Sequence, residues 1–269
     1  MKQTLNYGLA VAIALTGTAS FTTLSQAADV IAEVPAIELP PQPVSAGGWY
    51  LRGDVGYSST KFRDAKFPTY YKEGCCVTEG KEGHISGKLK GSFLVGGGVG
   101  YQATDYFRTD LTLDYLTRSR FRGHTGTTCV TDPDEHTFSC STSDRGKMSA
   151  LSLMANAYID IANINGFTPY VGAGIGGTRV KYGSFSKDTG SGNFDINDVA
   201  GASSWRFTWA LMAGASYDLT QNLKLDAGYR FRHVNGGKMH DGWGSNGAAY
   251  DKGLNIHDVR VGLRYQFDN

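Results

Sequence analysis

The sequence has 269 residues, a formal net charge of +1 at pH 7 and 41 % hydrophobic residues. A nearly neutral chain argues against a nucleic-acid-binding protein and against a protein that acts through its net charge. The 36 glycines suit a water-soluble β-sandwich as well as a membrane β-barrel, so the pattern along the chain has to distinguish the two.

The first residues indicate export. Lys2 supplies a short positive segment, residues 9–15 an apolar core, and residues 25–27 a small-residue cleavage site, which together predict a signal peptide over residues 1–27. The apolar core is too short for a membrane-spanning helix, and no other run reaches the roughly 18 apolar residues required. Four prolines within residues 28–47 favour extended conformations and predict a periplasmic leader.

The rest of the chain, residues 48–269, is dominated by alternation of apolar and polar residues. In residues 205–217 and 223–232 every second side chain is apolar, with aromatic residues near the ends of the apolar rows. This period of two is typical of β-strands with one apolar face. The strands exceed the usual length of about 5–6 residues and suffice for the roughly 9–11 residues that cross a bilayer. The same alternation recurs in residues 48–60, 88–102, 106–120, 147–160, 167–181 and 256–267.

The connections alternate between short and long. Short ones, residues 103–105, 161–166 and 218–221, follow the second, fourth and sixth strands. The others are long: residues 61–87, 121–146, 182–204 and 233–255. This organisation predicts an all-β fold, an eight-stranded antiparallel up-and-down transmembrane barrel with short periplasmic turns and four long outer loops. Loops such as residues 182–199 are expected to be too polar to form a core of their own.

The opening segment GWYLRGDVGY (residues 48–57), the repeated Gly-x-Gly strands and the closing segment VGLRYQF (residues 261–267) resemble the opacity-type outer-membrane barrel family. The likeness is to its alphaproteobacterial surface proteins, some of which are reported to bind haemin. It implies a monomer in the outer membrane of a Gram-negative bacterium, in contact with outer-membrane lipid and lipopolysaccharide. Such barrels usually end on the aromatic residue that the barrel-assembly machinery reads, whereas here Asp268 and Asn269 follow Phe267.

The polar faces of the strands predict a charged barrel interior. An eight-stranded barrel is only wide enough for its own side chains, so we expect ion pairs that fill the lumen. The alternative is a narrow pore that prefers anions because basic residues outnumber acidic ones. The basic residues are Arg52, Lys88, Lys90, Arg108, Arg118, Arg206, Lys224, Arg230, Arg232, Arg260 and Arg264, and the acidic ones are Asp54, Asp110, Asp114, Asp226 and Asp258.

All four cysteines lie in predicted outer loops: Cys75 and Cys76 in the first, Cys129 and Cys140 in the second. An exported protein meets an oxidising compartment, which favours disulfides. We favour a Cys129–Cys140 bridge, while a vicinal Cys75–Cys76 bridge or a crosslink between the two loops stays open. The spacing does not match a zinc site.

The histidines lie at or beyond the predicted outer rim. His240 follows Met239, and His233 lies nearby in the sequence, with Trp243 and Tyr250 available to stack on a porphyrin. Haemin capture is therefore a hypothesis, since imidazole is a common axial ligand, and the ordinary alternative is that loops collect polar residues. No other cofactor and no enzyme activity are expected.

These features predict an outer-membrane surface protein that contributes to envelope integrity and presents its loops to outside partners, such as a host surface, haemin or lipopolysaccharide sugars. The alternatives are a haemin- or ligand-binding receptor or adhesin, and a narrow anion-preferring pore.

Overall fold

The computed structural model describes residues 47–73, 76–79, 82–130, 137–188, 196–242 and 247–267. The predicted signal peptide and the leader up to residue 46 lie outside the described residues. No helix within the described ranges is long and apolar enough to cross a membrane.

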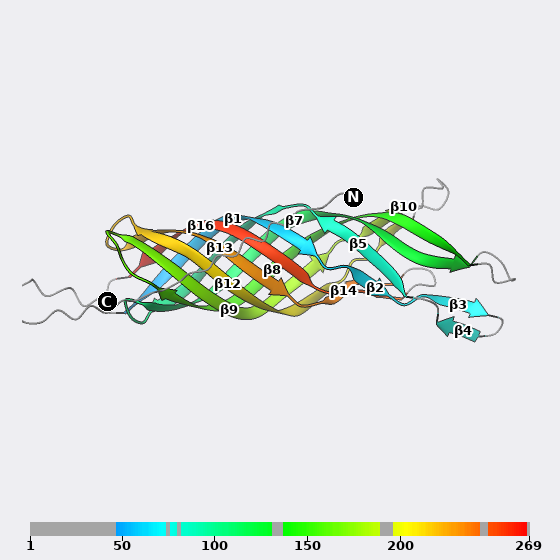
Figure 1. Ribbon diagram of the computed structural model, residues 1–269, viewed down its shortest axis with the longest axis horizontal. Helices are drawn as coiled ribbons and strands as arrows, with labels where there is room; N and C mark the ends of the chain where they lie inside the picture. Colours follow the sequence, from blue (N-terminus) through cyan, green and yellow to red (C-terminus); the bar gives the residue numbers. More distant parts are fainter. Residues whose placement is uncertain are drawn as a thin grey trace, which may run out of the picture. The chain divides into compact units, whose positions relative to one another are not determined.

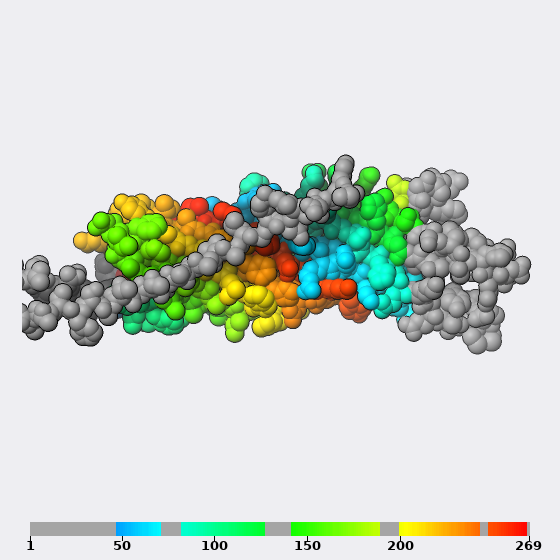
Figure 2. All heavy atoms as spheres, in the orientation of Figure 1, coloured from blue at the N-terminus to red at the C-terminus, as the bar shows by residue number. Residues whose placement is uncertain are grey.

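Eight antiparallel strands form the barrel that the alternation predicted (Figure 1). Each strand pairs with two neighbours, and pairing of the first with the last, seen as blue beside red in Figure 2, completes the circuit. They are β1 (Gly48–Phe62), β6 (Ser92–Gln102), β7 (Phe107–Val130), β8 (Thr137–Asp160), β9 (Phe167–Tyr182), β12 (Ser203–Asp218), β13 (Leu223–Val234) and β16 (Leu254–Gln266).

The register shows how far the strands are staggered. A line drawn from each residue to its partner on the next strand starts at Pro169 in β9 and goes once around the barrel. It returns to β9 at Arg179, ten residues further along. In an eight-stranded barrel this stagger corresponds to a strand tilt of about 40°. With that tilt, roughly 9–11 residues of each strand cross the apolar layer.

Exposed aromatic residues form two belts around the barrel. The inner belt, at the level of the short turns, includes Trp49, Tyr101, Phe107, Phe167, Tyr217 and Tyr265. The outer belt includes Tyr57, Phe93, Tyr115, Phe207 and Trp209. Apolar side chains such as Leu51, Leu111 and Val261 are exposed between them. Two belts that flank an apolar band are the pattern of a barrel in an outer membrane.

The short turn between β8 and β9 follows directly from its sequence. Asn165 and Gly166 have φ values of 52° and 86°, and Ile164 and Phe167 exchange backbone hydrogen bonds of 2.8 and 3.0 Å. An Asn-Gly pair with positive φ at both residues favours a two-residue hairpin because its twist matches that of the strands.

Beyond the outer belt the structure contradicts the expectation of polar loops without a core. The barrel strands β7 and β8 continue outward as a hairpin of 24 residues in each strand, and shorter strands pair alongside them. We call this part the outer extension. Its short strands are β2 (Ala65–Phe67), β3 (Tyr70–Glu73), β4 (Cys76–Glu79), β5 (Gly83–Leu89), β10 (Phe185–Asp188), β11 (Ile196–Val199), β14 (Gly237–His240) and β15 (Ala249–Asp251).

Apolar residues scattered over all four predicted loops meet inside the outer extension. The Phe121 ring lies 5.1 Å from that of Phe62 and 5.9 Å from that of Phe185, each in an edge-on arrangement. We call this buried cluster the outer core; it includes Phe62, Phe67, Ile85, Leu89, Phe121, Tyr182, Phe185, Met239, Ala249 and Leu254.

Two irregularities correct the predicted inward row. A bulge between Leu116 and Ser119 shifts the register of β7 by one residue, so Arg118 faces outward. The predicted second strand is broken at Lys90, where β5 ends and β6 has not begun, and both Lys88 and Lys90 are exposed. A uniform alternation could not reveal these changes of phase, because a bulge inserts a residue without changing the composition.

Candidate functional site: the charged lumen and the outer core

The barrel interior between the two belts is filled by a network of buried ion pairs. At mid-height Arg52 contacts Asp54 and Asp110, both at 2.8 Å, and Arg260 approaches Asp54 at 3.1 Å. Asp110 also accepts a hydrogen bond of 2.7 Å from the side-chain amide of Asn156. These groups come from β1, β7, β8 and β16, so the network ties the barrel wall together across its lumen.

Nearer the outer belt, Arg230 bridges Asp114 at 2.7 Å and Asp258 at 2.9 Å. Asp258 is also paired with Arg232 at 2.9 Å and accepts a hydrogen bond of 2.6 Å from the Ser58 hydroxyl. The Asp258 carboxylate therefore pairs with two arginines, and the Asp114 carboxylate pairs with one of them, Arg230.

Nearer the inner belt, Arg108 pairs with Asp160 at 3.1 Å and lies between the rings of Tyr158 and Tyr170, at 4.0 and 4.7 Å from their centroids. Contact with two aromatic faces stabilises a guanidinium that has few hydrogen-bond acceptors. Arg264 pairs with Asp226 at 3.3 Å.

Two predicted network residues lie at the ends of this system. Lys224 pairs with Asp218 at 2.5 Å at the inner mouth, where both side chains are partly exposed. Arg206 lies at the outer end and pairs with Asp251 of β15 at 2.8 Å. Arg206 therefore links the lumen to the outer extension.

The described interior carries equal numbers of buried cations and anions. Residues outside the predicted set account for the balance: Asp160 and Asp251 add negative charge, and Lys187 pairs with Asp144 inside the outer extension at 3.2 Å. The predicted basic excess is therefore wrong for the described residues, and with it the basis for anion preference. The buried cations are Arg52, Arg108, Lys187, Arg206, Arg230, Arg232, Arg260 and Arg264; the aspartates are 54, 110, 114, 144, 160, 226, 251 and 258.

Sequence reasoning missed these partners for different reasons. Asp160 lies on the predicted polar row of its strand, next to the start of a short turn, so alternation could have identified it. Asp144, Lys187 and Asp251 fall in segments predicted to be polar loops, for which no inward-facing row is predicted. Only the pairing of β10 and β15 with their neighbours brings these side chains inward.

The outer core also holds the residues of the haemin hypothesis. Met239 and His240 are both 0 % exposed, and the His240 ring packs 5.6 Å from the Phe185 ring. Burial lowers the pKa of His240 to about 4, while its hydrogen bond to the Asp241 carbonyl opposes this shift. His233 lies elsewhere, beside Trp209, and Tyr250 is exposed. Haemin binding stays a prediction, and it would require this core to open.

The cysteines are only partly described. Cys75 lies outside the described residues, and the backbone of Cys76 is in β4. In the β7–β8 hairpin the backbone register pairs Cys129 with Phe138 and Cys140 with Thr127, so the two cysteines are close to each other along the hairpin. The disulfides stay a prediction. Among the described residues, no group of three or more His, Cys, Asp and Glu could hold a metal ion.

Nearly the whole chain is similar to known outer-membrane proteins. Residues 14–267 match the model of the outer membrane protein beta-barrel domain. An uncharacterized protein of Brucella abortus (strain 2308) is 39 % identical, covering 97 % of this chain and 99 % of that protein.

Two further relatives have more informative names. The outer membrane protein PagN of Salmonella typhimurium is 31 % identical over 67 % of this chain and 75 % of its own length. A Rickettsia conorii protein that bears the name of a candidate adhesin is 28 % identical over 81 % of each chain.

Proposed function

Because this chain belongs to the outer membrane protein beta-barrel family, we propose that it is a surface-binding protein of the adhesin type, whose barrel is an anchor and whose outer extension is the recognition element. It is a β-barrel surface protein of the Gram-negative outer membrane. The observation that carries the proposal is the outer extension itself, a packed continuation of the barrel strands.

The interior supports an anchor better than a channel. Its ion pairs are buried and balanced in charge across the described residues, and the apolar outer core lies beyond them along the same strands. Moving water or an ion through this interior would require several of these pairs to separate inside a low-dielectric barrel, at several kcal/mol for each uncompensated charge. An aqueous channel is the property of much wider barrels.

The outer extension suits recognition because it is rigid. Loops that must order on binding lose conformational entropy, whereas strands held by a core are already ordered. The 24-residue strands β7 and β8 carry this hairpin well beyond the outer belt. The name of the Rickettsia conorii relative supports the same role.

Attachment of bacteria that display the full chain tests the proposal. In a non-adherent Gram-negative host, the protein should increase attachment to cultured epithelial cells by about an order of magnitude. In a trimmed variant, an Asn-Gly turn would replace residues 127–140 while keeping the Thr125–Thr142 pairing. The trimmed protein should still insert and should lose most of the gain.

The matched control removes the β3–β4 hairpin instead, by replacing residues 70–79. Attachment that survives both deletions would contradict the proposal. Stable conductance steps of the purified protein in a planar bilayer would favour the pore. Detergent sensitivity of a deletion strain with unchanged attachment would favour an envelope-integrity role.

A further inference from the structure

The outward face of the outer extension carries an unusual set of cations. In the register of β7 and β8, Arg120 lies opposite Lys147 and Arg122 opposite Arg145. Lys88 of β5 pairs with Arg122, and the Lys90 amide bonds to the Arg120 carbonyl, so both rows gain a third cation. All six side chains are exposed. We call Lys88, Lys90, Arg120, Arg122, Arg145 and Lys147 the basic band.

These cations are not compensated by the fold. Like charges directly opposite each other on neighbouring strands destabilise a sheet. None of the six has an ion-pair partner among the residues that the structure describes. The interior of the same barrel pairs each of its buried arginines with an aspartate, so unpaired arginines are confined to the outward face. The repeated juxtaposition therefore indicates a surface that meets anions outside the chain.

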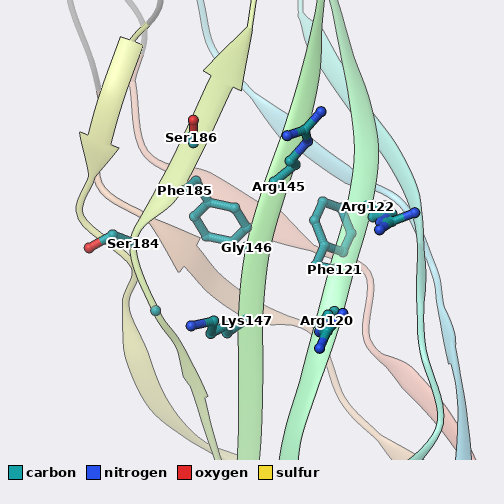
Figure 3. A pocket seen from close by; sticks show the side chains of 10 residues that line it. Arg120, Phe121, Arg122, Arg145, Gly146, Lys147, Ser184, Phe185 and Ser186 are labelled. Carbon is teal, nitrogen blue, oxygen red and sulfur yellow. The ribbon is translucent and has the colours of Figure 1, made fainter.

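Four of the six residues of the band line a crevice. A cavity of about 410 Å³ is lined by Arg120, Arg122, Arg145 and Lys147, with Ser184 and Ser186 on its other side (Figure 3). Phe121 and Phe185 also belong to its lining. Arginine forks and hydroxyl groups together match the oxygens of phosphate groups on a sugar.

The height of the band identifies the source of the anion. Along β7, Arg120 comes five residues after Tyr115 of the outer belt, with one residue taken up by the bulge. At about 3.3 Å per residue and a tilt of about 40°, Arg120 lies about 10 Å above the belt and Arg122 about 15 Å. Phospholipid headgroups occupy only about 5–8 Å on each side of the hydrocarbon. A glycolipid whose phosphorylated sugars extend further outward covers the whole band.

We infer that the basic band binds the phosphorylated sugar headgroup of lipopolysaccharide in the surrounding leaflet, with the crevice over β7, β8 and β10 holding one phosphate-bearing sugar. Arg179 and Lys181 of β9 are exposed on the same side and extend the contact towards the outer belt. This contact lies on the flank of the outer extension, so it does not depend on the adhesin role of the hairpin.

The test measures binding of the refolded full chain in detergent micelles to fluorescent deep-rough lipopolysaccharide and to the same glycolipid after chemical dephosphorylation. The phosphorylated form should bind at least about tenfold more tightly. The triple variant R120Q/R122Q/R145Q should lose about tenfold in affinity. The matched control K61Q/R63Q/K252Q removes three exposed cations outside the band and should change affinity by less than about threefold.

Folding of each variant is checked by the mobility difference between boiled and unboiled samples. If the triple variant does not fold, the two single variants R122Q and K147Q take its place. Equal affinity for phosphorylated and dephosphorylated glycolipid would overturn the inference, as would equal losses in the triple variant and its control. Tighter binding of soluble heparin oligosaccharides through the same residues would also overturn it, by assigning the band to a sulfated glycan.

Discussion

The barrel between the aromatic belts and the outer extension are built from the same strands, but their interiors are opposite. On β1, Leu51 and Val55 face outward while Arg52 and Asp54 are buried. Further along the same strand, with no change of phase, Lys61 is exposed and Phe62 is buried.

The surroundings explain this inversion. Between the belts the outward side chains meet lipid, so apolar residues belong outside and the interior is left to polar groups that satisfy one another. Beyond the outer belt the outward side chains meet water, and the hydrophobic effect again drives apolar residues inward. The two regions should therefore respond differently to substitution.

The largest effect is expected from the lumen. Asp258→Ala removes the carboxylate that Arg230 and Arg232 share and leaves both guanidinium groups buried. It should lower the free energy of unfolding by about 4 kcal/mol. Urea unfolding in lipid vesicles, followed by tryptophan fluorescence, measures the loss.

The control for this variant is Asp218→Ala at the inner mouth, whose partner Lys224 can turn to water. It should cost less than about 1 kcal/mol. Equal losses in the two variants would show that the lumen is wet enough to solvate its charges.

A smaller and local effect is expected from the outer core. Phe121→Ala should create a cavity that destabilises the outer extension by about 3 kcal/mol. Amide hydrogen exchange of β5 and β10 should accelerate, while the boiled-versus-unboiled gel shift of the barrel should be unchanged. A variant that fails to insert would instead show that the outer core is needed to fold the membrane part.

The smallest effect is a dependence on pH. The pKa of His240 is about 4 in the folded extension, against about 6.5 when exposed. The contribution of neutral, buried His240 to the stability of the outer extension is complete above pH 6.5. It declines as the pH falls towards 4, because the unfolded segment takes up a proton first. At pH 4.5 the loss should be about 2 kcal/mol.

Exchange of the β14 amides, corrected for the intrinsic effect of pH, measures this change. The variant His240→Gln should flatten the difference between pH 7 and pH 4.5. An unchanged slope would assign the dependence to the buried Lys187–Asp144 pair of the same extension.

The sequence predicts the membrane part of this fold well because lipid imposes a strict period of two. The eight barrel strands, the short turns and most lumen residues follow from that period alone. The predicted inward direction of Arg118 is wrong because one bulge residue changes the phase.

The outer extension was harder to predict because its core is assembled from isolated apolar residues. Phe67, Ile85 and Phe185 come from three short strands in two loops, each surrounded by polar residues. Their burial depends on pairings between segments that are distant in sequence, which a local pattern does not reveal.

The bulge between Leu116 and Ser119 restricts how this family of chains can change in length. It sets which residues of β7 enter the outer core and which enter the basic band. Adding or losing one residue above it would exchange the two sets, turning Arg120 and Arg122 towards the phenylalanine rings. Related chains should therefore vary in this part of the hairpin by even numbers of residues.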